Sequence, residues 1–160
     1  MPHEATRLKE KFGTVDERVA RLNARYKNHS ATSVLELALR DAELGRIALV
    51  SSFGAESVVL LHMISVIKPT TPVVFIDTQM LFQETIDYQL ELIEKLDLRD
   101  VRRIQPKPAA VAQIDPDGTL NQRDTDACCS LRKTIPLQDA MIGYDAWITG
   151  RKRFQAGTRA

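Results

Sequence analysis

Four short, mostly apolar runs alternate with segments of helical pattern, and this alternation is the feature that most restricts the fold. The runs are Ile47–Val50, Val73–Ile76, Val101–Ile104 and Asp145–Ile148. They lack the in-and-out alternation of apolar and polar residues that marks a strand with one solvent-exposed face. Buried strands separated by helices are typical of a parallel sheet. The sequence therefore predicts an α/β fold, with a parallel twisted sheet covered by helices on both faces.

The segments around these runs predict the covering helices. We expect one or two surface helices over 4–27, and helices over Val34–Leu44, Glu56–Lys68, Phe82–Leu96, Ala109–Gln113 and Cys128–Ile142. Ser33 and Glu36 have capping-box spacing, and Gly45 is a favourable stop for the helix that they begin. Pro136 should disturb the last helix, because proline has no N–H to donate.

One of these helices has a clear apolar pattern. Phe82, Ile86, Leu90 and Ile93 recur at helical spacing within Phe82–Leu96. These four side chains should lie on one face of the helix.

Composition limits the class of protein. A chain of 160 residues is long enough for one domain with a core, and we expect a single domain with a helical segment over about residues 1–30. The net charge of +1 gives no overall electrostatic case for binding nucleic acid or a membrane. The apolar stretch Val58–Ile67 is too short to span a bilayer. The beginning does not resemble a signal peptide, and two cysteines indicate a reducing compartment, so we expect a cytoplasmic protein.

The turn after the first run is rich in small residues. Ser51, Ser52 and Ser57 surround Gly54 in the sequence Ser-Ser-Phe-Gly-Ala-Glu-Ser. A small-residue turn between a strand and a helix directs N–H groups at one point, and Gly54 allows close approach of a ligand. The segment is not a Walker loop, because no Gly-Lys-Ser/Thr follows. By spacing alone, a phosphate or sulfate site and a plain capped turn both remain open.

Two further segments begin at the same predicted edge of the sheet. Asp77 and Thr78 follow the second run, where Asp77 could cap a turn or contact a ligand. The segment 150–159 follows the fourth run and carries four cations without an acid. It could be a solvated basic end or a clamp for an anion, since arginine binds phosphate in a bidentate fork. Its position beside the other two segments favours the clamp.

Cys128 and Cys129 are the only cysteines of the chain. Neighbouring cysteines rarely satisfy disulfide geometry. The pair could be two small buried apolar residues. Arg132 and Lys133 lie close by and favour metal ligation or reactivity of a thiolate. Both interpretations remain open from spacing alone.

Taken together, these motifs resemble the adenylyl-sulfate/phosphoadenylyl-sulfate reductase family, the thioredoxin-dependent enzymes of assimilatory sulfate reduction. The matching pieces are Ser51–Ser57, Asp77-Thr78 with Leu81-Phe82 and Glu84-Thr85, Cys128–Lys133 with Pro136-Leu137, and Asp145–Gln155. The resemblance covers about residue 30 to the end. It implies an adenine-nucleotide α-hydrolase-like fold. It also implies reduction of adenylyl sulfate or phosphoadenylyl sulfate to sulfite, with release of AMP or adenosine 3′,5′-bisphosphate and electrons from thioredoxin.

The resemblance also implies roles for individual residues. The nucleotide and phosphosulfate pocket would be lined by Ser51, Ser52, Phe53, Gly54 and Thr78, and gripped by Lys152 and Arg153 with Arg151 nearby. Cys128 and Cys129 would be two ligands of a [4Fe–4S] cluster, and Lys133 would lie between cluster and substrate. Family members with the cysteine pair usually prefer adenylyl sulfate over its 3′-phosphorylated form.

The chain departs from the family in three respects, one of which is Ala156-Gly157 in place of a commoner small hydroxyl residue beside Gln155. Gln79 stands where many members have glycine, so the turn after Thr78 should differ. The family's second cysteine pair and its nucleophilic cysteine have no counterpart among the 160 residues, although a four-iron cluster needs four thiolates. We therefore expect a chain truncated at its C-terminus, with the nucleophile beyond Ala160 and no turnover by this chain alone.

Two other functions compete with the reductase. An ATP-pyrophosphatase-type ligase uses the same kind of loop, but usually with a second glycine and an aspartate where this chain has Phe53 and Glu56. A non-catalytic nucleotide-binding remnant is the third hypothesis. Homo-oligomerisation and the preference for the 3′-phosphate are left open by the sequence.

Overall fold

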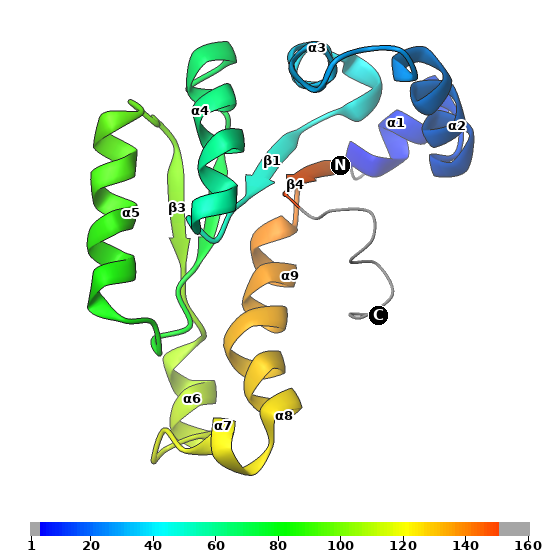
Figure 1. The fold of residues 1–160 in the computed structure, drawn as a ribbon. Helices are drawn as coiled ribbons and strands as arrows, with labels where there is room; N and C mark the ends of the chain where they lie inside the picture. Colours follow the sequence, from blue (N-terminus) through cyan, green and yellow to red (C-terminus); the bar gives the residue numbers. More distant parts are fainter. Residues whose placement is uncertain (1–3, 151–160) are drawn as a thin grey trace. The chain divides into compact units, whose positions relative to one another are not determined.

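A computed structural model describes residues 4–150, with side chains from residue 7 onwards (Figure 1). The helices are α1 (Glu4–Phe12), α2 (Val15–Tyr26), α3 (Ala31–Ala38), α4 (Val58–Ile67), α5 (Gln83–Lys95), α6 (Pro108–Ile114), α7 (Leu120–Arg123), α8 (Thr125–Cys129) and α9 (Ile135–Met141). The strands are β1 (Ile47–Val50), β2 (Val73–Ile76), β3 (Val101–Ile104) and β4 (Ala146–Thr149). Two short 3₁₀ turns, η1 (Ala42–Leu44) and η2 (Ala55–Ser57), and a π-helical turn, η3 (Ser130–Thr134), complete the described part.

The described residues divide into two compact units. One unit contains residues 4–47 with 143–147, and the other contains residues 48–142 with 148–150. The first consists mainly of helices α1 to α3, and the second holds most of the sheet with α4 to α9. The expected single domain with a helical segment over about residues 1–30 stays a prediction.

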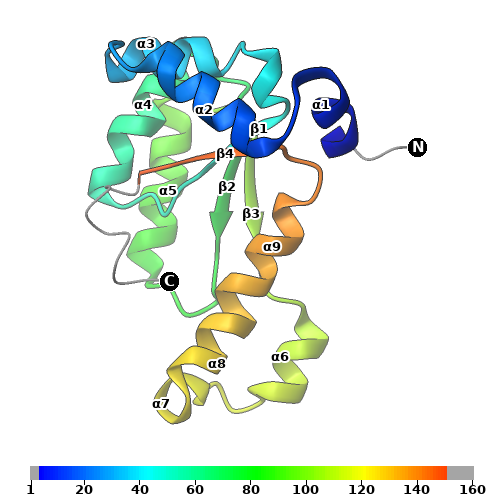
Figure 2. The same ribbon diagram turned by 90° about the vertical axis from the view of Figure 1, so that its right-hand side faces the viewer.

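The strands form one sheet in the order β3-β2-β1-β4. β1 and β2 are parallel, with Leu49 opposite Val73, and β2 and β3 are parallel, with Ile76 opposite Ile104. Helices α4 and α5 lie on one side of the sheet and α9 lies on the other (Figure 2). The predicted parallel α/β fold with helices on both faces is confirmed. Because all these strands run in one direction, their carboxyl ends meet at one edge.

The core of the second unit lies between the sheet and α4. Its most deeply buried side chains include Leu49, Leu61, Ile64, Val73 and Val74, each at most 1% exposed. β-branched and leucine side chains at these positions exclude water from both faces of the central strands. Their burial fixes where the strand ends, and therefore where the loops that follow them lie.

The predicted single helix over Val34–Leu44 is wrong. The chain forms α3 instead, stops, and then forms the 3₁₀ turn η1. Ser30, rather than Ser33, caps α3, because its Oγ accepts a hydrogen bond of 3.2 Å from the Ser33 N–H. Asp41 then accepts from the Glu43 N–H at 2.9 Å, which starts a new turn. A carboxylate that caps the following turn competes with continuation of the helix.

The apolar residues that the sequence places on one face of α5 are only partly buried. Phe82 and Leu90 are 80% and 57% exposed, whereas Ile86, Gln89 and Leu92 are buried. Phe82 has extended backbone as the N-cap residue, so its side chain lies outside the helical periodicity that the pattern assumed.

The expected disturbance at Pro136 takes the form of the π-helical turn η3 directly before it. Pro136 lies in the first turn of α9 and cannot donate to the carbonyl of Arg132. The wider turn of η3 absorbs this missing hydrogen bond. The short helix expected over Ala109–Gln113 is present as α6, and α7 follows it.

A buried ion pair connects η3 to two other segments. The side chains of Arg132 and Asp115 are 6% and 0% exposed, and Arg132 donates to Asp115 Oδ2 from Nε at 3.0 Å and from Nη2 at 2.6 Å. Arg132 Nη1 also donates to the carbonyl oxygen of Thr78 at 3.0 Å. The other carboxylate oxygen of Asp115 accepts from the Leu120 N–H at 2.9 Å. The pair thus joins η3, the α6–α7 connection and the loop after β2.

This pairing predicts how stability depends on pH. Hydrogen bonds from Arg132 hold the pKa of Asp115 below its ordinary value of 3.8. The stabilisation of the fold by the ionised carboxylate is therefore complete above the ordinary pKa. It is lost as the pH falls through the lower pKa that Asp115 has in the folded protein. Asp115→Asn should lower the free energy of unfolding at neutral pH, and the gap to the wild type should narrow below about pH 4. Urea unfolding of both proteins at several pH values measures the gap.

The exposed Lys107–Asp139 pair supplies the control. Its side chains are 75% and 46% exposed, so Asp139→Asn should change stability little at any of these pH values. A gap for Asp115→Asn that stays constant from neutral to acid pH would contradict the assignment of the carboxylate as the stabilising group.

Candidate functional site

Two loops gather at the carboxyl edge of the sheet, one after β1 and one after β2. The Ser51 N–H donates to the Val74 carbonyl at 3.0 Å, and the Asp77 N–H donates to the Ile104 carbonyl at 2.8 Å. These bonds extend the parallel pairing to the first residue of each loop. Helices α6, α7 and α8 lie beyond this edge (Figures 1 and 2).

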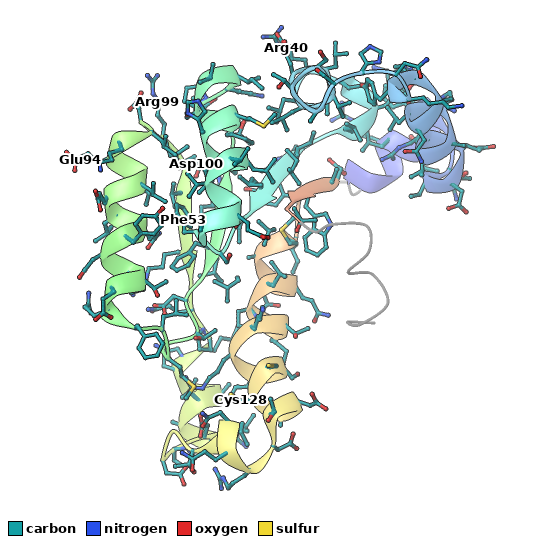
Figure 3. All side chains as sticks on the ribbon, viewed as in Figure 1. Arg40, Phe53, Glu94, Arg99, Asp100 and Cys128 are labelled. Atoms are coloured by element: carbon teal, nitrogen blue, oxygen red, sulfur yellow. The ribbon has the colours of Figure 1, made fainter. Side chains whose placement is uncertain are left out.

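The loop after β1 is anchored by a strained aromatic residue. Phe53 has a φ of +57°, a left-handed conformation that is costly for a bulky side chain. The residue is 1% exposed, and its ring packs edge-on against Phe75 with the ring centroids 5.4 Å apart. Figure 3 shows the Phe53 side chain beside the strands. Because the whole residue is buried, Phe53 anchors the loop in the core and offers no exposed side chain to a ligand.

The serine hydroxyls of this loop bind its own backbone. The buried Ser51 Oγ accepts from the Phe53 N–H at 3.1 Å, and the exposed Ser52 Oγ accepts from the Gly54 N–H at 3.4 Å. The Oγ atoms of Ser52 and Ser57 lie 3.4 Å apart. The N-cap residues of η2 and α4 are Gly54 and Ser57, and neither element has a side-chain hydrogen bond at its N-cap. Helices α2 and α3, by contrast, each have one. A helical N-terminus without a side-chain cap can accept an anion.

Asp77 begins the loop after β2 and is 2% exposed. Its Oδ2 accepts from Arg103 Nε at 2.9 Å, Arg103 Nη2 at 2.7 Å and Gln105 Nε2 at 2.6 Å. Its Oδ1 accepts from the Gln79 N–H at 2.9 Å. Burial raises the pKa of Asp77, but hydrogen bonds from Gln105, the Gln79 N–H and Arg103 outweigh it, so the pKa lies below its ordinary value. Asp77 is therefore an anion that holds the turn in place.

The turn itself is strained at Gln79, whose φ is +61°. The backbone adopts the left-handed conformation that a glycine would take without cost, so Gln79 keeps this geometry under strain. Thr78 is held through both its side-chain hydroxyl and its carbonyl. Its Oγ1 accepts from the Met80 N–H at 3.3 Å, and its carbonyl accepts from Arg132.

The two cysteines lie in different surroundings. Cys128 is buried against Leu120 and Leu131, whereas Cys129 is exposed, and both are free thiols. Figure 3 shows Cys128 on α8, away from Phe53 and the strands. Lys133 is exposed in the adjoining turn η3. The part of the chain that the structure describes has no cluster of three or more His, Cys, Asp or Glu side chains that could hold a metal. It therefore does not form a complete ligand set for a four-iron cluster.

The predicted cations Arg151, Lys152 and Arg153 lie outside the described residues. The described chain ends at Gly150, next to α4. A Cβ atom placed on Gly150 would lie 3.5 Å from Leu60 Cδ1, in the first turn of that helix. The last described residue therefore lies beside the helix that follows the Ser51–Ser57 loop.

Sequence reasoning missed the structural role of four residues that shape this edge: Arg103, Gln105, Asp115 and Arg132. Their partners lie 17 to 54 positions away in the sequence, so no local spacing reveals the pairs. The one usable signal is the pair Arg102-Arg103 inside the run Val101–Ile104, but it does not tell which arginine binds Asp77.

Known proteins resemble this chain over most of its length. Residues 46–160 match the family model described as the phosphoadenosine phosphosulfate reductase domain. An adenosine 5′-phosphosulfate reductase from Mesorhizobium japonicum is 47% identical over 146 residues, which cover 91% of this chain and 58% of that protein. Another from Bacillus cereus is 34% identical over 149 residues, covering 92% of this chain and 63% of that protein. The chain thus spans about three fifths of these relatives.

A solved structure agrees with these matches. A phosphoadenylyl-sulfate reductase from Candida auris, crystallised as a phosphate complex, superposes with a TM-score of 0.73 and 26% identity over 89% of this chain and 70% of that chain. The fold, the loops at the sheet edge and the sequence relatives all agree: the chain belongs to the phosphoadenosine phosphosulfate reductase domain family.

Proposed function

We propose that this chain carries the sulfonucleotide-binding part of a reductase that converts adenylyl sulfate, or phosphoadenylyl sulfate, to sulfite in sulfate assimilation. The main support is that the family match over residues 46–160 contains both loops at the carboxyl edge of the sheet. The named relatives are adenosine 5′-phosphosulfate reductases. The proposed setting is the cytoplasm. No described helix is long and apolar enough to cross a membrane.

The phosphosulfate would lie at the uncapped start of η2 and α4. There the backbone of Ser51, Ser52, Phe53 and Gly54 approaches the ligand, and the helix start favours its negative charge. Thr78 would line the pocket from the neighbouring strand. Arg151, Lys152 and Arg153 would complete the grip, because the chain leaves β4 beside α4.

The proposed chemistry is covalent. A cysteine thiolate attacks the sulfur of the substrate, the bond from sulfur to the phosphate oxygen breaks, and AMP or adenosine 3′,5′-bisphosphate leaves. Thioredoxin then supplies two thiols, releases sulfite from the S-sulfocysteine and ends as a disulfide. We assign the nucleophile to a cysteine that these 160 residues do not contain, because Cys128 and Cys129 have another role.

That role is ligation of a [4Fe–4S] cluster, for which Cys128 and Cys129 would supply two of the four thiolates. Cys129 is already exposed, and Cys128 lies one position away in the same helix. Lys133 would face both the cluster and the substrate from η3. The two remaining thiolates would come from outside these 160 residues, and self-association of the chain stays open.

The first test is binding without turnover. We expect calorimetry to detect adenylyl sulfate and AMP binding to the 160-residue chain, while a sulfite assay with reduced thioredoxin detects no release. Ser52→Ala with Ser57→Ala should weaken binding by about tenfold, because the hydroxyls that hold the loop are lost. Preference for ATP over adenylyl sulfate would favour the ligase instead. Sulfite release by the chain alone would contradict the assignment of the nucleophile.

A second test concerns the cysteine pair. After anaerobic reconstitution with iron and sulfide, we expect the chain to hold well below one four-iron cluster per molecule, because two thiolates cannot complete the ligand set. Iron and sulfide analysis measures the occupancy. Without metal, Cys129 should react with iodoacetamide faster than Cys128, since only Cys129 is exposed. A full cluster per monomeric chain, or faster alkylation of Cys128, would contradict this proposal.

A third test asks whether ligand binding depends on the turn that Asp77 holds or only on the positive charge of β3. Arg103→Gln removes two of the donors to the Asp77 carboxylate and should weaken adenylyl sulfate binding by about tenfold, because the strained turn at Gln79 loses its support. Calorimetry measures the change in affinity.

The matched control is Arg102→Gln. Arg102 is the neighbouring residue of β3, is 46% exposed against 44% for Arg103, and pairs with Asp100 through Nε and Nη2 at 2.9 Å each. This variant removes the same charge but leaves the Asp77 turn intact, so affinity should change less than about twofold. Equal effects of the two variants would show that only charge matters at this edge.

A further inference from the structure

Arg18 of helix α2 is buried, and none of the described side chains supplies its counter-charge. Its exposed fraction is 8%, and its Nε has no hydrogen-bond partner. No ion pair to Arg18 is formed by any residue whose side chain the structure describes. A buried guanidinium without a partner is costly, so its presence indicates that something supplies negative charge.

The other arginines of the same helix are paired in the usual way. Arg21 and Arg25 are both 45% exposed and bind the carboxylates of Glu43 and Asp41. Arg18 lies one turn before Arg21 on the same side of the helix, yet neither Asp41 nor Glu43 pairs with it. The ion-pair network that α2 makes with η1 therefore does not supply the counter-charge of Arg18.

Arg18 lines a cavity of about 620 Å³ within the first unit. The cavity walls also include Lys9 of α1, the apolar side chains of Leu8 and Val15, and Tyr144. This volume lies in the range of small-molecule sites, which are mostly apolar with a few polar groups that orient the ligand. Two cations and three largely apolar side chains together suit an anionic group attached to an apolar body.

One carboxylate, Asp145, also lines the cavity. Its Oδ2 accepts a hydrogen bond of 2.8 Å from the Arg46 N–H. This bond ties Asp145 to the residue that precedes β1. The Asp145 carboxylate forms no ion pair with Arg18. The nearby Glu17 is likewise engaged in the capping box with Thr14. Neither acid neutralises Arg18.

We propose that this cavity binds a small organic anion, whose phosphate or carboxylate pairs with Arg18 and Lys9 and whose apolar part lies against Leu8, Val15 and Tyr144. The site lies outside the strand-end loops of the proposed reductase, and most of its residues precede the family match that begins at residue 46. It is therefore a second site, and its occupation does not depend on the proposed reaction.

The test uses phenyl phosphate, which combines an anionic head with an apolar ring, and the 160-residue chain. We expect calorimetry to detect binding to the wild type, and Arg18→Met to weaken that binding by more than about tenfold. Without ligand, Arg18→Met should unfold at the same or a higher temperature, because a methionine side chain removes a buried unpaired charge. A purely structural role for Arg18 predicts the opposite change in stability.

Arg21→Met is the matched control, since it removes a charge from the same helix but leaves the cavity intact. Its affinity for phenyl phosphate should equal that of the wild type. Lys9→Met, an exposed position, gives a second variant that should weaken binding by several fold if Arg18→Met fails to fold. Benzoate and inorganic phosphate as alternative probes distinguish a carboxylate ligand from a phosphate, and test whether the ring contributes.

The outcomes are distinct from those of the reductase tests. Phenyl phosphate binding at the Ser51–Ser57 loop would persist in Arg18→Met, so undiminished binding by that variant overturns the proposal. Absence of binding by the wild type overturns it as well. Loss of binding in Arg18→Met with retained adenylyl sulfate binding supports a separate site.

Discussion

The buried contact between Arg132 and Asp115 is the interaction on which the arrangement at the sheet edge depends. Both side chains are almost fully removed from water, so neither can lose its partner without a large penalty. Through this pair and the Thr78 carbonyl, the cysteine-bearing segment, the α6–α7 connection and the loop after β2 are held together. The missing N–H of Pro136 and the wide turn before it account for the backbone geometry from which Arg132 projects.

Of the three described non-glycine residues with left-handed backbone, two lie where the ligand is proposed to bind and one, Asp97, lies elsewhere. Phe53 and Gln79 both adopt left-handed backbone, one in each loop of the edge. Such conformations persist only when the surrounding structure holds them. The Phe53 ring is fixed in the core against Phe75, and the Gln79 turn is fixed by Asp77 with its donors from β3. The loops therefore have little freedom to rearrange before a ligand arrives, which lowers the entropic cost of binding.

The strand positions were predictable because buried β-branched runs such as Val73–Ile76 have few alternatives to a parallel sheet. The helix ends were less predictable from the sequence. Ser30 and Ser33 are equally suitable N-cap residues, and only the tertiary structure selects one of them. The candidate site rests on its motifs, Ser51–Gly54 and Thr78, and stays a prediction. The residues that hold it, Arg103 and Arg132, could not be found, because their partners are distant in sequence and buried charge pairs have no periodicity.

The central claim is that the two strand-end loops form the binding surface for a sulfonucleotide. A titration of the isotope-labelled chain with adenylyl sulfate, followed by amide NMR, tests it most directly. The account predicts saturable shifts of the Phe53, Gly54 and Gln79 amides, with little change for amides of α2 such as Leu22. Shifts confined to α2 and its surroundings, or no shifts at millimolar ligand, would contradict it.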